Sequence, residues 1–170
     1  RLLQGDVGSG KTILALIAAA NVIESKYQVA FMAPTEILAS QHYELAKKLF
    51  FSTNIKIELL TSKTNAKNKR KIISNLKNGS INFLIGTHSL FQKKIKFSNL
   101  GFIIIDEQHK FGVFQRMSFT NKAKKPSILV MSATPIPRTL SLAAYGDMNE
   151  SKLTEKPLGR IPIKTSAVSL

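Results

Sequence analysis

Residues 5–12 read GDVGSGKT, the most informative stretch of this chain. The octapeptide fits G-x-x-x-x-G-K-[ST] at every fixed position, and it lies between an apolar run and an Ala-rich helical pattern. In such a loop, glycines let backbone N–H groups curl around phosphate oxygens, the lysine reaches the β- and γ-phosphates, and the last hydroxyl ligates Mg²⁺. The stretch therefore predicts a nucleotide-binding P-loop; a glycine-rich turn without a ligand is the alternative. The binding candidates are Gly5, Asp6, Val7, Gly8, Ser9, Gly10, Lys11 and Thr12.

Downstream of this loop, apolar runs of strand length alternate with helical patterns. Runs such as FIII and ILVM are apolar without interruption, which is typical of strands buried on both faces. Strand, helix and strand in alternation predict an α/β, doubly wound domain with a mainly parallel sheet. We expect strands at residues 1–4, 28–33, 55–60, 82–85, 102–105 and 127–132, and helices at residues 12–26, 36–50 (capped by Thr35) and about 67–78 (ended by Gly79).

Length and charge narrow the possible functions. The 170 residues suit one domain, and the formal net charge of +15 favours a polyanionic partner such as nucleic acid. From Leu59 to Ile105 no residue is acidic, so this region should attract phosphates. General use of lysine as a solvated residue is the alternative. The basic residues there are Lys63, Lys67, Lys69, Arg70, Lys71, Lys77, Lys93, Lys94 and Lys96.

Composition also excludes several classes of protein. No apolar run approaches the roughly 18–20 residues of a membrane-spanning helix, and the N-terminus has no secretory pattern, so we expect a cytoplasmic protein without a membrane partner. The absence of cysteine excludes disulfides, thiolate catalysis and Cys-ligated metals. His42, His88 and His109 are too scattered for a metal-binding motif.

A second motif, FIIIDEQH at residues 102–109, places two carboxylates at the end of an expected strand. Ligands of open α/β sheets bind at the carboxyl ends of strands. Asp106 would hold Mg²⁺ directly or through water, and Glu107 would orient and deprotonate the attacking water. Taken alone, the motif could equally be a strand end that meets solvent.

Five segments follow one another in a characteristic order: GDVGSGKT, APTEILASQH, GTHSLF, DEQHKFGVFQR and SATPIPRT. Together they resemble the ordered motifs of superfamily 2 helicases and, within that superfamily, those of the RecG family. The families of the transcription-repair coupling factor and the primosomal helicase are the nearest alternatives; the Gln in DEQH and the run MSATPIPRTLSLAAYGD favour RecG. The resemblance implies a three-layer, RecA-like P-loop NTPase fold, ATP and Mg²⁺ as cofactors, and branched or forked DNA as the partner.

The resemblance also implies roles for individual residues. For ATP hydrolysis it implies that the catalytic residues are Lys11, Asp106, Glu107, Gln108 and His109. It implies that Thr12 and Asp106 bind the Mg²⁺ ion. The residues for nucleic-acid contact and its coupling to hydrolysis are Pro34, Thr35, Gln41, Gly86, Thr87, His88, Ser132, Ala133 and Thr134. From the residues alone, Thr35 is equally an ordinary N-cap and His88 equally a buried core histidine. Two departures from the family pattern are Ser62-Lys63, where a glycine is usual, and Lys110, where an arginine is usual.

Finally, the resemblance implies a longer protein, with a second RecA-like lobe and an N-terminal wedge domain. We expect a helicase ATP-binding domain at residues 1–155, then a linker and the start of the second lobe at residues 156–170. The predicted function is the ATP-hydrolysing motor of a DNA helicase that acts on branched DNA in fork reversal, recombination and repair. Alternatives are an ATP-switched nucleic-acid-binding module with little turnover, a coupling-factor type of double-stranded DNA translocase and, on charge alone, an RNA substrate.

Overall fold

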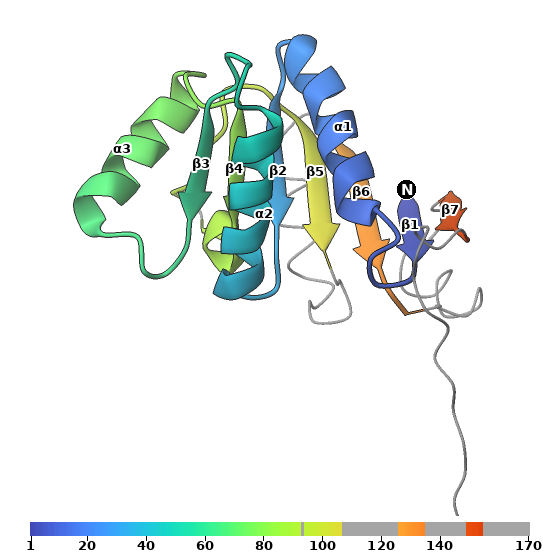
Figure 1. Ribbon diagram of the computed structural model, residues 1–170. Coiled ribbons are helices and arrows are strands. Elements are labelled where there is room, and N and C mark those ends of the chain that lie inside the picture. Colours follow the sequence, from blue (N-terminus) through green and yellow to red (C-terminus); the bar gives the residue numbers. More distant parts are fainter. Residues whose placement is uncertain (93, 107–125, 135–148, 155–170) are drawn as a thin grey trace, which may run out of the picture.

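The computed structural model describes residues 1–92, 94–106, 126–134 and 149–154. Within this part of the chain, seven strands form one sheet in the order β3-β4-β2-β5-β6-β1-β7, and every pairing between them is parallel (Figure 1). The strands are β1 Leu2–Gly5, β2 Gln28–Met32, β3 Ile57–Leu60, β4 Phe83–Gly86, β5 Leu100–Asp106, β6 Ser127–Ser132 and β7 Glu150–Leu153. The other elements are α1 Lys11–Glu24, α2 Glu36–Leu49, α3 Ala66–Lys77 and the 3₁₀ turn η1 His88–Phe91.

Helices cover both faces of the sheet and form two separate apolar cores. On one face, α1 packs on β1, β2 and β5 and α2 packs on β3 and β4, and this core buries Leu16, Phe31 and Ile104. On the other face, Ile72 and Leu76 of α3 pack against the sheet together with η1. This arrangement confirms the predicted three-layer α/β fold with a parallel sheet.

Local signals in the sequence explain where the helices begin and end. Thr35 caps α2 by accepting a hydrogen bond from the Leu38 N–H at 3.2 Å, as its sequence position predicts. Asn65 does the same for α3 with the Asn68 N–H at 2.8 Å, and Gly79 ends that helix in the left-handed region at φ 79°. The boundaries of all six predicted strands are confirmed to within two residues.

Two elements were not predicted from the sequence. The edge strand β7 pairs in parallel with β1, with Leu2 opposite Glu150. Its sequence, ESKL, is mostly polar and half-exposed, so it lacks the apolar run that marks the inner strands. The turn η1 follows β4 with one residue between them, and no helical turn was expected there.

The strand order determines which loops can meet. β6 lies between β1 and β5, so the P-loop after β1 and Asp106 at the end of β5 are separated by a single strand. Because all these strands are parallel, their carboxyl ends meet at one edge of the sheet, the lower edge in Figure 1. That edge carries the predicted site residues.

Gly86, at the end of β4, is required by packing. A Cβ added there would lie 2.2 Å from the carbonyl oxygen of Leu60, the residue opposite it in β3. We expect Gly86→Ala to destabilise the domain by about 3 kcal/mol, the upper end of the usual range for overpacking, because a paired strand backbone cannot move aside. Urea denaturation checks this.

The control is Gly79→Asn, because a Cβ at Gly79 would meet nothing nearer than 3.8 Å and asparagine tolerates the left-handed conformation. It should cost less than about 1 kcal/mol. Equal losses in the two variants would show that the Gly86–Leu60 approach is not limiting.

Candidate functional site

The P-loop joins β1 to α1 with a backbone that only glycine adopts readily. Gly8 and Gly10 have φ values of 82° and 91°, in the left-handed region. Gly10 is the N-cap of α1, and no side chain caps the helix there. The first N–H groups of α1 are therefore left for an acceptor from outside the helix, which is the arrangement that binds phosphate.

Lys11 lies over this loop. It is only 9% exposed, and its Nζ donates hydrogen bonds to the carbonyl oxygens of Gly5 at 2.6 Å and Asp6 at 2.9 Å. An ammonium group has three N–H donors, so these two bonds position it and a third donor can reach a ligand. Nearby, the buried Ser9 Oγ has no hydrogen-bond partner within the described segments. An unpaired buried hydroxyl in the same loop as this ammonium group fits a loop that receives phosphate oxygens.

Asp106 ends β5 on the face that α1 and α2 cover, since Phe102 and Ile104, of the same strand parity, belong to that core. It is buried, with 8% exposed. Thr12, in the first turn of α1, is half-buried. A carboxylate and a hydroxyl are the hard oxygen donors that Mg²⁺ prefers, so the pair fits the predicted metal site.

The end of β6 forms a small polar turn beside Asp106. Met131 is opposite Asp106 in the register, and Ser132 comes next. The Ser132 Oγ contacts the Thr134 Oγ1 at 3.1 Å and accepts from the Thr134 N–H at 3.2 Å. The half-buried Ala133 lies between them. Residues 132–134 (SAT) thus form a hydrogen-bonded turn at the end of β6, the strand next to the one that ends in Asp106.

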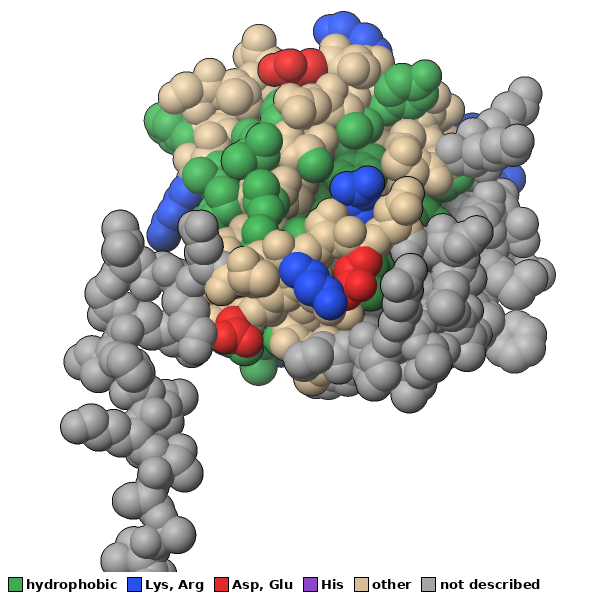
Figure 2. All heavy atoms as spheres, turned by 90° about the vertical axis from the view of Figure 1, so that its right-hand side faces the viewer, with side chains coloured by type: hydrophobic (Ala, Val, Ile, Leu, Met, Phe, Trp, Pro, Cys, Tyr) green, Lys and Arg blue, Asp and Glu red, His purple; other side chains and the backbone are tan. Residues whose placement is uncertain are grey.

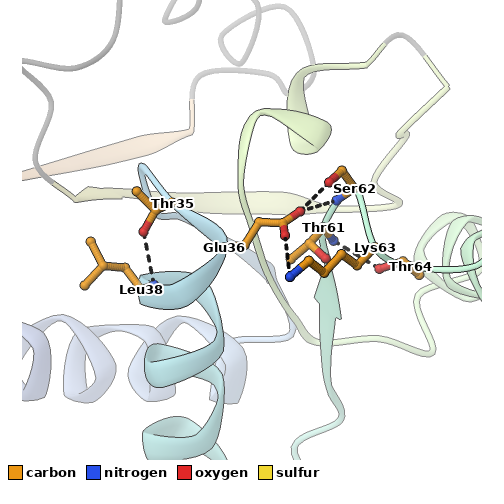
Figure 3. A network of polar contacts seen from close by, with 7 residues as sticks. All are labelled: Thr35, Glu36, Leu38, Thr61, Ser62, Lys63 and Thr64. Atoms are coloured by element: carbon orange, nitrogen blue, oxygen red, sulfur yellow. Dashed lines mark hydrogen bonds and ion pairs between the residues drawn. The ribbon is translucent and has the colours of Figure 1, made fainter.

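At the same edge, the N-terminus of α2 is tied to the loop after β3 (Figure 3). The Glu36 carboxylate accepts hydrogen bonds from the N–H of Ser62 at 2.9 Å and from its hydroxyl, and it lies 3.7 Å from the Lys63 ammonium. The hydrogen bond from the Ser62 hydroxyl has the largest effect on the pKa of Glu36 and lowers it below its usual value. The positive charge of Lys63 also lowers this pKa. The departure from the family pattern at Ser62-Lys63 therefore supplies the two groups that fix this loop to α2.

The remaining predicted nucleic-acid residues lie on or near this edge with different exposure. Thr35 and Gln41 of the α2 region are exposed and Pro34 is half-buried. Thr87 is half-buried and His88 is exposed, so the alternative of a buried core histidine is wrong. The predictions for Glu107, Gln108 and His109 fall outside the described residues, as do Lys110 and the linker expected at residues 156–170.

His42 is a site residue that the sequence interpretation missed. Its Nε2 lies 2.8 Å from Asp106 Oδ2, and both side chains are about nine-tenths buried. The available signal was its spacing: with Ala39 and Ala46 it forms the buried stripe of α2. A polar side chain in such a stripe needs a partner.

Exposed apolar side chains gather on one side of the domain, as Figure 2 shows. Those of the P-loop and α1 are Val7, Ile13, Leu14 and Ile17, from 40% to 71% exposed. Exposed apolar patches of this kind mark surfaces that contact other parts of a protein. Over the described segments, no helix has the length and apolar character needed to cross a membrane.

Comparison with known proteins shows which family and which fold the chain matches. Residues 1–142 match the model of the DEAD/DEAH box helicase family. The chain is 51% identical over 170 residues to the ATP-dependent DNA helicase RecG of Thermotoga maritima and 50% identical over 167 residues to that of Aquifex aeolicus. These alignments cover 100% and 97% of this chain but 22% and 21% of the relatives, so the chain spans about a fifth of their length.

A solved structure of RecG bound to a three-way DNA junction superposes with a TM-score of 0.81 at 49% identity. The matched region covers 96% of this chain and 22% of the RecG chain.

Proposed function

The chain belongs to the DEAD/DEAH box helicase family, and from this membership we propose that it is the first motor lobe of an ATP-dependent DNA helicase of the RecG type, acting on branched DNA. The observation that carries the proposal is the joint arrangement of Lys11 over its loop and buried Asp106 one strand away. Fork reversal, recombination and repair in the cytoplasm are the processes that such a motor would serve.

For the ATP reaction, we assign roles to the residues of the sheet edge. The N–H groups at the start of α1 and the Lys11 ammonium bind the phosphates. Thr12 and Asp106 would hold Mg²⁺, which would neutralise charge on the β- and γ-phosphates. Glu107 would orient the attacking water and take its proton, and Gln108 and His109 would relay the state of the site toward Ser132 and Thr134.

For DNA, we assign the loops at the carboxyl ends of β2, β3 and β4. Thr35, Lys63 and His88 expose one hydroxyl and two basic groups there. On the other side of α3, a groove presents Lys69, Arg70 and Lys94. Support for DNA over RNA comes from the RecG relatives and the junction-bound structure, since a basic surface alone does not distinguish the sugars.

We also propose partners within the same protein. A second RecA-like lobe and a wedge domain would account for the fourfold to fivefold greater length of the relatives. The apolar surface of Val7, Ile13, Leu14 and Ile17 is a surface that such a domain could cover.

The test is ATP hydrolysis by the full-length helicase proposed here, with and without forked DNA. We expect at least tenfold stimulation by a fork, less by a linear duplex of the same length, and a steep loss as salt rises because phosphate contacts release counterions. A fork made of RNA is the control for sugar specificity. If no DNA stimulates hydrolysis, the motor assignment fails.

A further inference from the structure

The contact between His42 and Asp106 joins two segments that the proposed function uses separately. His42 belongs to α2, whose N-terminus carries the candidate DNA residue Thr35, and Asp106 is the candidate metal ligand. Because an ionised carboxylate only accepts hydrogen bonds, the imidazole Nε2 donates to Oδ2 across 2.8 Å. Among the described residues, this is the contact that fixes the orientation of the carboxylate.

The imidazole is itself held from both sides. Its ring stacks on Phe31 of β2, with centroids 4.6 Å apart and planes 25° apart. The helix turns above and below contribute Ala39 and Ala46, both fully buried. This stacking and burial favour the side-chain position that faces Asp106. Oδ2 is engaged by His42, and within the described segments Oδ1 has no hydrogen-bond partner, so Oδ1 is the oxygen we assign to a cation or its bound water.

The helix also connects this contact to the nucleic-acid edge. His42 lies seven residues, or roughly 10 Å, along α2 from Thr35. At the N-terminus of this helix, the Glu36 carboxylate binds the loop that contains Ser62 and Lys63. If a nucleic-acid phosphate binds Thr35 or Lys63 and shifts them, the same shift reaches α2, the helix whose His42 positions Asp106.

We propose that His42 is a positioning residue that orients Asp106 for Mg²⁺ and transmits movement of α2 from the nucleic-acid edge to the ATP site. The inference rests on the proposed function. Outer partners of metal-ligating groups typically change metal affinity by about 10–100-fold when they are removed. A histidine retained only for packing would have no such effect on the metal.

The variant His42→Phe keeps the ring on Phe31 but removes the donor. In the full-length helicase, we expect it to raise the MgCl₂ concentration for half-maximal binding of a fluorescent, non-hydrolysable ATP analogue by about tenfold or more. Binding in EDTA should be unchanged, and stimulation of hydrolysis by forked DNA should fall. His42→Gln, whose amide nitrogen can take the place of Nε2, should restore most of both properties.

Glu44→Gly, at an exposed position of α2, is the control for stability, because it weakens the helix by up to about 1 kcal/mol on a face that does not carry His42. It should lower the melting temperature and leave the MgCl₂ requirement unchanged. A wild-type MgCl₂ requirement in His42→Phe, or an equal shift in Glu44→Gly, would overturn the positioning role. A wild-type protein that binds the analogue but is not stimulated by DNA would instead overturn the proposed motor function, and the coupling with it.

Discussion

Lys11→Ala is expected to abolish DNA-stimulated ATP hydrolysis, with a loss of at least about 10²–10³-fold in kcat, because its ammonium stabilises charge on the phosphates as the transition state forms. In the structure this group is already positioned, with two hydrogen bonds to the carbonyl oxygens of Gly5 and Asp6. Little reorganisation is then needed to direct the charge at a ligand. Steady-state hydrolysis with saturating forked DNA measures the loss.

Two further measurements make this result specific. Since Lys11 also stabilises its own loop, the melting temperature of the variant must be compared with wild type. Lys48→Ala, an exposed lysine in the last turn of α2, is the matched control and should keep full activity. If wild type hydrolyses ATP only slowly and Lys11→Ala hydrolyses it at the same rate, the result would favour an ATP-switched binding module over a motor.

The parts of the fold that sequence predicts best are those fixed by short-range chemistry. The P-loop is recognisable because glycines, lysine and threonine must stand at set positions between a strand and a helix. Thr35 and Gly79 were identified as helix ends for similarly local reasons. By contrast, β7 depends on a partner strand almost 150 residues away, and its own residues carry no strand signal.

The candidate site shows the same division. Asp106 is predictable because an apolar strand ends in a carboxylate, but its bond to His42 spans 64 residues and depends on how α2 packs. The role of Ser62 is equally non-local, because the Glu36 that binds it lies 26 residues away. Sequence patterns identify the reactive groups, whereas the contacts that orient these groups depend on tertiary packing.

The second prediction with a large effect concerns the rest of the motor. We expect the 170 residues alone to hydrolyse ATP about 10³–10⁵-fold more slowly than a chain that also contains the proposed second lobe, both with forked DNA. A transition-state arginine supplied across the cleft between two lobes contributes a factor of that size. In the proposed site, Lys11, Thr12 and Asp106 would bind phosphate and metal from one side only.

The comparison needs a binding control, because a slow rate could also reflect an empty site. The isolated domain should bind the non-hydrolysable analogue in an Mg²⁺-dependent manner, since the P-loop and Asp106 belong to the same folded unit. It should not separate the strands of a fork, because stepping requires two lobes that open and close against each other. Strand separation by the 170 residues alone, or hydrolysis as fast as that of the longer chain, would mean that this domain completes the ATP site without a partner.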